Sequence, residues 1–173
     1  RLAQGRDMTL VDKSPSYAAS VDTLCRAEEI FEAPRYLFLT RHPHAVMESY
    51  VRNRMTAMAG PQRSERDPWA AAEHHWTTHN RNVLALLERV PERRQTRIAF
   101  EELVRRPRAE MERLCAFLGK PFHEATLDPY GGGRMTDGPG DPAFHEHRGI
   151  DARLAEGEAR PPRPPCAASS DVA

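Results

Sequence analysis

Two polar side chains, Arg41 and Ser49, follow an apolar run at a spacing that suits anion binding. The run, Tyr36–Thr40, is short and β-favouring, and it predicts a strand buried on both faces, as in parallel sheets. Pro43 has a preset φ and no N–H, so it suits the first position of a helix, whose N-terminus attracts anions. Ser49 lies seven residues, close to two turns, beyond His42. We therefore expect Arg41 and Ser49 to share one face and to bind one anion, most plausibly a phosphate.

Both side chains also have an ordinary structural interpretation. An arginine after a strand often forms a surface ion pair, which contributes little to stability, and a serine on a helix is often merely solvated. The phosphate interpretation requires both to lie in the crevice at the carboxyl end of the strand, where α/β sheets bind ligands.

A second charged turn follows residues 9–11, which form a short candidate strand. This segment ends at Asp12-Lys13-Ser14-Pro15, so we expect Lys13 on the same sheet edge as Arg41. A helix capped by Ser20 or Asp22 and running through Phe31 would separate the two strands. Its length suits a parallel crossover, which predicts a right-handed βαβ unit.

Downstream, the sequence predicts another long helix, another strand and a shorter helix. Asp67-Pro68 is typical of a helix start, and an apolar stripe continues from it to Arg89 or Val90. Residues 96–100 predict a strand. Residues 109–118 predict an amphipathic helix that Gly119 closes in a left-handed cap.

Several motifs, in order, resemble those of one enzyme family. The motif L-x-R-x-P at 39–43, with a serine eight residues after its arginine, resembles the 3′-phosphate-binding motif of sulfotransferases that use 3′-phosphoadenosine 5′-phosphosulfate (PAPS). The segment DKSPSY at 12–17, the pattern W-x-x-x-N-x-N at 76–82 and the block FEELV at 100–104 are similar to other segments of that family. The segment 129–151 resembles the tail of sulfotransferase domains embedded in polyketide synthase and peptide synthetase assembly lines. The likeness runs from about residue 9 to residue 154.

The resemblance implies an α/β fold of the P-loop-like sulfotransferase type, a partial three-layer parallel sheet flanked by helices. It implies transfer of a sulfuryl group from PAPS, as co-substrate and without a metal, to a hydroxyl or amine. The acceptor would be a small molecule or a carrier-protein-bound polyketide or peptide intermediate.

The resemblance also implies roles for individual residues. Lys13 would stabilise negative charge on the departing phosphate oxygen, and Arg41 and Ser49 would hold the 3′-phosphate. Asn80 would belong to the nucleotide pocket, although it and Trp76 can equally be core residues. A late basic loop supplies two candidates for nucleotide binding, Arg134 and Arg148, and two for the general base, His145 and His147.

One expected feature is absent from this sequence. No Ser/Thr/Gly-rich turn that could cradle the 5′-phosphosulfate occurs before Thr9. We therefore expect residues 1–156 to be the C-terminal portion of a sulfotransferase domain, lacking the N-terminal phosphosulfate-loop strand. The composition of residues 157–173 predicts a Pro/Ala-rich disordered tail or linker. Two alternatives stay open: another α/β nucleotide-binding enzyme such as a small-molecule kinase, and a non-catalytic remnant or tethering module.

Composition excludes several other classes. The formal net charge is zero, which gives no electrostatic case for binding nucleic acid or an anionic membrane. No apolar run approaches the length that crosses a bilayer. The three cysteines lie far apart and read as reduced thiols of a cytoplasmic protein. Of His74, His75 and His79, the last two are four residues apart, as in some metal sites. No carboxylate or third ligand accompanies them at a recognisable spacing, so no metal site is expected.

Overall fold

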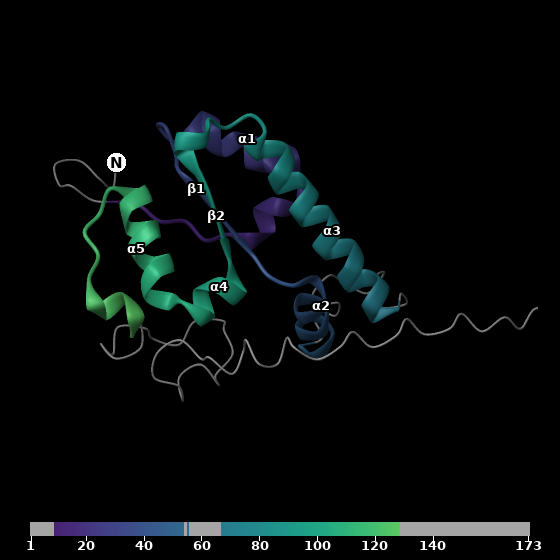
Figure 1. Cartoon of the computed structure of the whole chain (residues 1–173). Helices are drawn as coiled ribbons and strands as arrows, with labels where there is room; N and C mark the ends of the chain where they lie inside the picture. The colour runs from purple at the N-terminus through teal and green to yellow at the C-terminus, as the bar shows by residue number, and fades with distance from the viewer. Residues whose placement is uncertain (1–8, 54, 56–66, 129–173) are drawn as a thin grey trace, which may run out of the picture.

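The computed structural model describes residues 9–53, 55 and 67–128 (Figure 1). Their order along the chain is η1 (Pro15–Ala19), α1 (Val21–Ile30), β1 (Tyr36–Thr40), α2 (Pro43–Arg52), α3 (Pro68–Leu87), η4 (Glu92–Arg94), β2 (Gln95–Ala99), α4 (Phe100–Arg105), α5 (Pro107–Leu118) and η5 (Glu124–Leu127), where η denotes a 3₁₀ helix. The mixture of helices and a small parallel sheet confirms the predicted α/β class.

The two strands β1 and β2 pair in parallel, in a register that joins Tyr36 to Gln95 and Thr40 to Ala99. The connection between them runs through α2 and α3. Figure 1 shows α1 and α3 on one side of the strands and α5 on the other. This three-layer arrangement is the one expected for helices that cover both faces of a parallel sheet.

The predicted strand at residues 9–11 is wrong. The segment is irregular, and Leu10 and Val11 are 71% and 79% exposed. A strand needs a neighbour to accept and donate its backbone hydrogen bonds, and within the described residues this segment has no such partner. The predicted βαβ unit across α1 is therefore not formed, and the parallel pair is β1 with β2.

The strand β1 is confirmed at its predicted bounds, but its predicted burial on both faces is wrong. Tyr36, Phe38 and Thr40 are half-buried, and the Tyr36 hydroxyl donates a 2.6 Å hydrogen bond to Glu28 on α1. Leu37 and Leu39 lie on the opposite face and are 45% and 51% exposed. Ile98, the register partner of Leu39 on that face, is 2% exposed, so the face is covered over β2 and partly exposed over β1.

Helix boundaries follow the local signals in the sequence. The Ser20 hydroxyl accepts from the Thr23 N–H at the start of α1, and Pro43 occupies the first turn of α2. The Asp67 carboxylate accepts from the Trp69 N–H at 3.1 Å and caps α3, which ends at Leu87, slightly before its predicted end. Gly119 closes α5 with a left-handed φ of 67°, which glycine adopts without strain.

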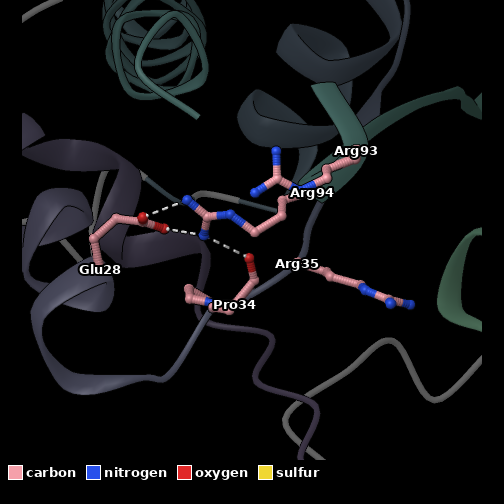
Figure 2. A pocket seen from close by; sticks show the side chains of 6 residues that line it. Glu28, Pro34, Arg35, Arg93 and Arg94 are labelled. Atoms are coloured by element: carbon pink, nitrogen blue, oxygen red, sulfur yellow. Dashed lines mark hydrogen bonds and ion pairs between the residues drawn. The ribbon is translucent and has the colours of Figure 1, made fainter. Parts of the chain in front are cut away.

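The amino ends of the two strands are tied to α1 by Arg94 (Figure 2). The guanidinium of Arg94 donates to both carboxylate oxygens of Glu28, at 3.0 and 2.8 Å, and to the Pro34 carbonyl oxygen at 3.0 Å. These charged hydrogen bonds, with the one from Tyr36, hold the pKa of Glu28 below its usual value. The bidentate contact fixes the α1–β1 loop at the sheet edge opposite the carboxyl ends.

The core is small and centred on β2. Its buried apolar residues, all less than 9% exposed, are Ala72, Leu86, Val90, Ile98, Val104 and Cys115. Ile30, at the end of α1, is 69% exposed and lies outside this core. Cys25 and Cys115 are free thiols in this structure. Among the described helices, none is both long enough and apolar enough to cross a membrane.

Candidate functional site

The carboxyl ends of β1 and β2 bring Arg41 against Phe100. The last residue pair of the two strands is Thr40 with Ala99, and Arg41 and Phe100 are the residues that follow. The guanidinium carbon of Arg41 lies 4.7 Å from the centre of the Phe100 ring. One residue further, the backbone N–H of His42 donates to Glu101 Oε1 at 2.7 Å. The stacking confines the guanidinium, and the hydrogen bond fixes the turn into α2.

The start of α2 lies at the same end of the strands as Arg41, and Glu101 accepts from the backbone of its N-cap residue. His42 is the N-cap residue, and its side chain makes no capping hydrogen bond. Further along α2, the Ser49 hydroxyl accepts from Asn53 Nδ2 at 3.2 Å. A hydroxyl that accepts one hydrogen bond still has its own proton to donate. Arg41 and the start of α2 thus lie at the carboxyl ends of the strands, and Ser49 lies seven residues beyond His42 along α2, so their joint binding of a phosphate stays a prediction.

Lys13 lies in the irregular segment before η1, with an exposed side chain. Because residues 9–11 form no strand, Lys13 does not occupy the predicted strand end. Its neighbours are bonded to each other: the Ser14 hydroxyl donates to Asp12 Oδ1 at 2.6 Å. The position of Lys13 is therefore set by this turn and by η1, which packs against α1 and α3.

Asn80 lines a shallow hollow along one side of α3. The residues around it are Trp76, Thr77, Asn80, Arg81, Leu84, Ala85 and Glu88. Asn80 Nδ2 donates to the Trp76 carbonyl oxygen at 2.7 Å, within its own helix. Both residues are half-buried, so Trp76 is not part of the buried core.

Comparison with known proteins gives the family. A family model described as "Sulfotransferase family" matches residues 2–124. The chain belongs to the sulfotransferase family. Two solved structures are also similar to it, and both are sulfotransferase domains. No curated protein matches the chain.

The two similar structures come from biosynthetic systems. The sulfotransferase domain from the curacin biosynthetic pathway is 39% identical with a TM-score of 0.82, and the match covers 91% of this chain and 58% of that one. The sulfotransferase domain from the Synechococcus PCC 7002 olefin synthase is 42% identical with a TM-score of 0.77, covering 88% and 52%. This sulfotransferase chain thus spans little more than half of each solved domain. The predicted resemblance to sulfotransferase domains of this kind is confirmed, and it favours a sulfotransferase over a small-molecule kinase.

Three aromatic rings join α2 to α3 near this site. Tyr50 meets His75 edge to face with ring centres 4.9 Å apart, and the His75 and His79 rings lie 3.7 Å apart. Partial burial and the neighbouring His75 lower the pKa of His79. Within residues 9–53, 55 and 67–128, no group of three or more potential ligands could hold a metal ion.

Four predicted site residues, Arg134, His145, His147 and Arg148, lie outside the described residues, as does the predicted tail.

Three supporting contacts were not predicted. Phe100 stacks on Arg41, and Glu101 accepts a hydrogen bond from His42. The sequence indicated these contacts only through the position of both residues directly after a strand that could pair with Tyr36–Thr40. Asn82 of α3 donates to the Ala18 carbonyl oxygen of η1 at 2.9 Å, a contact for which single-sequence reasoning has no signal.

Proposed function

We propose that this chain is part of an enzyme that transfers a sulfuryl group from PAPS to a hydroxyl or amine. The observation that carries the proposal is Arg41, stacked on Phe100 where β1 ends and α2 begins, in a chain of the sulfotransferase family. A cationic fork beside a helix N-terminus suits the 3′-phosphate that distinguishes this nucleotide from other adenosine phosphates.

In the proposed reaction the acceptor oxygen or nitrogen forms a bond to sulfur as the bond from sulfur to the 5′-phosphate oxygen breaks. The electron pair of that bond stays on the leaving oxygen, so adenosine 3′,5′-bisphosphate departs with an added negative charge. The proton of the acceptor passes to a base. As in phosphoryl transfer, positioning and charge stabilisation supply the catalysis, because the transferred group undergoes an in-line displacement.

Three described residues have roles in this proposal. Arg41 and Ser49 hold the 3′-phosphate: the guanidinium is confined by Phe100, and the Ser49 hydroxyl is oriented by Asn53. Lys13 places its ammonium near the leaving oxygen, where it is worth most in the transition state. The exposure of Lys13 is compatible with contact to a bound nucleotide.

The remaining predicted contacts stay proposals from the sequence. Asn80 contributes to the nucleotide pocket, with the hollow along α3 as its surroundings. Arg134 and Arg148 bind the nucleotide, and His145 or His147 accepts the acceptor's proton.

For the acceptor we propose a small molecule or an intermediate bound to a carrier protein. The two similar structures belong to a biosynthetic pathway and an olefin synthase, which supports an acceptor that is built stepwise. A cytoplasmic location stays a prediction, and the free thiols Cys25 and Cys115 support it.

A further segment of the same domain is the partner that the sheet requires. The exposed face of Leu37 and Leu39, and the coverage of 58% and 52% of the two solved domains, support a segment that packs on β1. The loop that cradles the 5′-phosphosulfate belongs to that segment in this proposal.

The test of this function is a pair of measurements on the complete domain. Calorimetry should detect binding of adenosine 3′,5′-bisphosphate, with much weaker binding of adenosine 5′-phosphate, which lacks the 3′-phosphate. Transfer of ³⁵S from labelled PAPS to small and carrier-bound acceptors should be detectable by chromatography. Equal affinity for the two nucleotides, with no transfer to any acceptor, would contradict the proposal and favour a non-catalytic module.

A further inference from the structure

Asn82 joins the helix α3 to the turn η1, across 64 positions of sequence. Its Nδ2 donates to the Ala18 carbonyl oxygen at 2.9 Å, and the hydrogen bond is partly buried. Asn80, two positions earlier, instead donates within its own helix, to Trp76. Of these two asparagines, Asn82 is therefore the one whose amide connects separate elements.

The turn η1 has no buried residue of its own to fix its position. It is a 3₁₀ helix of five residues, none of them buried. Short 3₁₀ helices have poor hydrogen-bond geometry, and the segment that precedes this one has no regular structure. Figure 1 shows η1, in purple, beside α3, and it packs against both α1 and α3. Because a partly buried carbonyl needs a donor, the Asn82 amide favours one position of η1 on α3.

Two hydrogen bonds of Ser14 connect η1 to the backbone around Lys13. The Tyr17 N–H donates to the Ser14 carbonyl oxygen at 3.0 Å, which closes the first turn of η1. The Ser14 hydroxyl donates to Asp12 Oδ1 at 2.6 Å. Lys13 lies between Asp12 and Ser14, which are bonded to each other, and Ser14 is bonded to η1. The backbone of Lys13 therefore moves with η1.

We propose that Asn82 is a positioning residue for sulfuryl transfer, which fixes the backbone of Lys13 by holding Ala18. The inference rests on the proposed role of Lys13. An ammonium stabilises the leaving oxygen only from within a short distance, and a misplacement of about 1 Å far from the reacting atoms can cost on the order of a hundredfold in rate. Loss of the Asn82 contact should therefore slow the chemical step and leave nucleotide affinity nearly unchanged.

The first test measures the anchor without using activity. Asn82→Asp removes both amide donors and sets a carboxylate against the Ala18 carbonyl oxygen. In the complete domain, hydrogen exchange at the amides of Tyr17 and Ser20, which bond within η1, should become about tenfold faster. Asn80→Asp is the matched control, with the same substitution on the same helix, and should leave these two amides unchanged.

The second test measures the link to Lys13. Asn82→Asp should lower kcat by about tenfold while the Kd for adenosine 3′,5′-bisphosphate changes little. In a Lys13→Met background the same substitution should have almost no further effect, because the positioned group is gone. Asn82→Gln, which keeps the donor, should recover part of the rate. Glu73→Gln, at an exposed site on α3, should leave kcat unchanged.

The outcomes separate the possible failures. Unchanged exchange at Tyr17 and Ser20 in Asn82→Asp would overturn the anchor. A rate loss of the same size with and without Lys13 would overturn the link and leave Asn82 a general structural residue. Normal turnover of Lys13→Met would show that Lys13 has no role in the chemical step, and the proposal for Asn82 would fall with it. The hydrogen-exchange data would still show whether Asn82 holds η1, so the two failures can be distinguished.

Discussion

The guanidinium carbon of Arg41 lies 4.7 Å from the centre of the Phe100 ring, and both residues come directly after paired parallel strands. The contact follows from the register: the strands end together at Thr40 and Ala99, so the next residue of each lies at the same sheet edge. The next pair, His42 and Glu101, is joined by a hydrogen bond of 2.7 Å. Side-chain contacts thus join the two residue pairs that follow the last backbone pair of the sheet.

Arg41→Ala should weaken the binding of adenosine 3′,5′-bisphosphate to the complete domain by roughly tenfold or more. A hydrogen bond to a charged group contributes about 1.5–3 kcal/mol, and each 1.4 kcal/mol is about tenfold in Kd. Calorimetry measures the change directly. Phe100→Leu should give a smaller loss, because it frees the guanidinium and leaves its charge in place.

Arg35→Ala is the matched control for Arg41→Ala. Arg35 precedes β1 at its amino end, where it donates to the Phe117 carbonyl oxygen at 2.8 Å. Its loss should leave nucleotide affinity unchanged and lower only the melting temperature. If Arg41→Ala and Arg35→Ala weakened the nucleotide equally, or if neither did, the phosphate assignment at Arg41 would be wrong.

Lys13→Met should lower the turnover of the complete domain by on the order of a hundredfold, as loss of one preorganised charge does. The Kd for the nucleotide should change much less, because the charge that Lys13 stabilises develops only in the transition state. Single-turnover kinetics at saturating PAPS measure the chemical step. Lys120→Met, which replaces the other lysine of the chain, should leave that step unchanged. A collapse of affinity with a normal single-turnover rate would make Lys13 a binding residue instead.

The local features of this fold could be predicted from sequence because their causes are local. Pro43 at the first turn of α2, the Asp67 cap of α3 and the left-handed Gly119 each act within a few residues. The shared phosphate site of Arg41 and Ser49 was expected from local spacing as well, and it stays a prediction.

The predictions that failed depended on partners elsewhere in the fold. Residues 9–11 have the composition of a strand, but no strand lies beside them among the residues that the structure describes. Leu37 and Leu39 are apolar residues of the kind expected in a core, yet both are about half exposed. The pairing of Asn82 with Ala18 depends on where α3 meets η1, which one sequence does not indicate.

The exposed face of β1 leads to a prediction about the 173-residue chain expressed alone. Leu37 and Leu39 are 45% and 51% exposed, so the chain should bind a hydrophobic dye or associate with itself. A version extended upstream by about a hundred residues, a length taken from typical domain size, should bind less dye and melt cooperatively. Fluorescence of the dye and calorimetric melting measure the two properties.

Substitution of these leucines locates the dye-binding surface. Threonine keeps strand propensity and removes apolar area, so Leu37→Thr with Leu39→Thr should reduce dye binding by the short chain. Leu84→Thr, at a 48% exposed position on α3, is the control. If dye binding responded to Leu84 alone, or if the short chain melted cooperatively and transferred sulfuryl groups, the requirement for a further segment would be refuted.

The pair His75 and His79 on α3, which contacts Tyr50 of α2, should make stability fall in mild acid. The pKa of His79 is lowered from its ordinary value of 6.5 by burial and by His75, so below that value the unfolded chain binds the proton more readily than the folded one. The stability from neutral His79 is therefore complete above about pH 6.5 and declines as the pH falls through that value towards the lowered pKa. Denaturant midpoints of the complete domain should drop between about pH 7.5 and about pH 5.5, and His79→Gln should flatten the drop. His44→Gln, at an exposed site on α2, should not, and an equal drop in all three proteins would show that other groups control it.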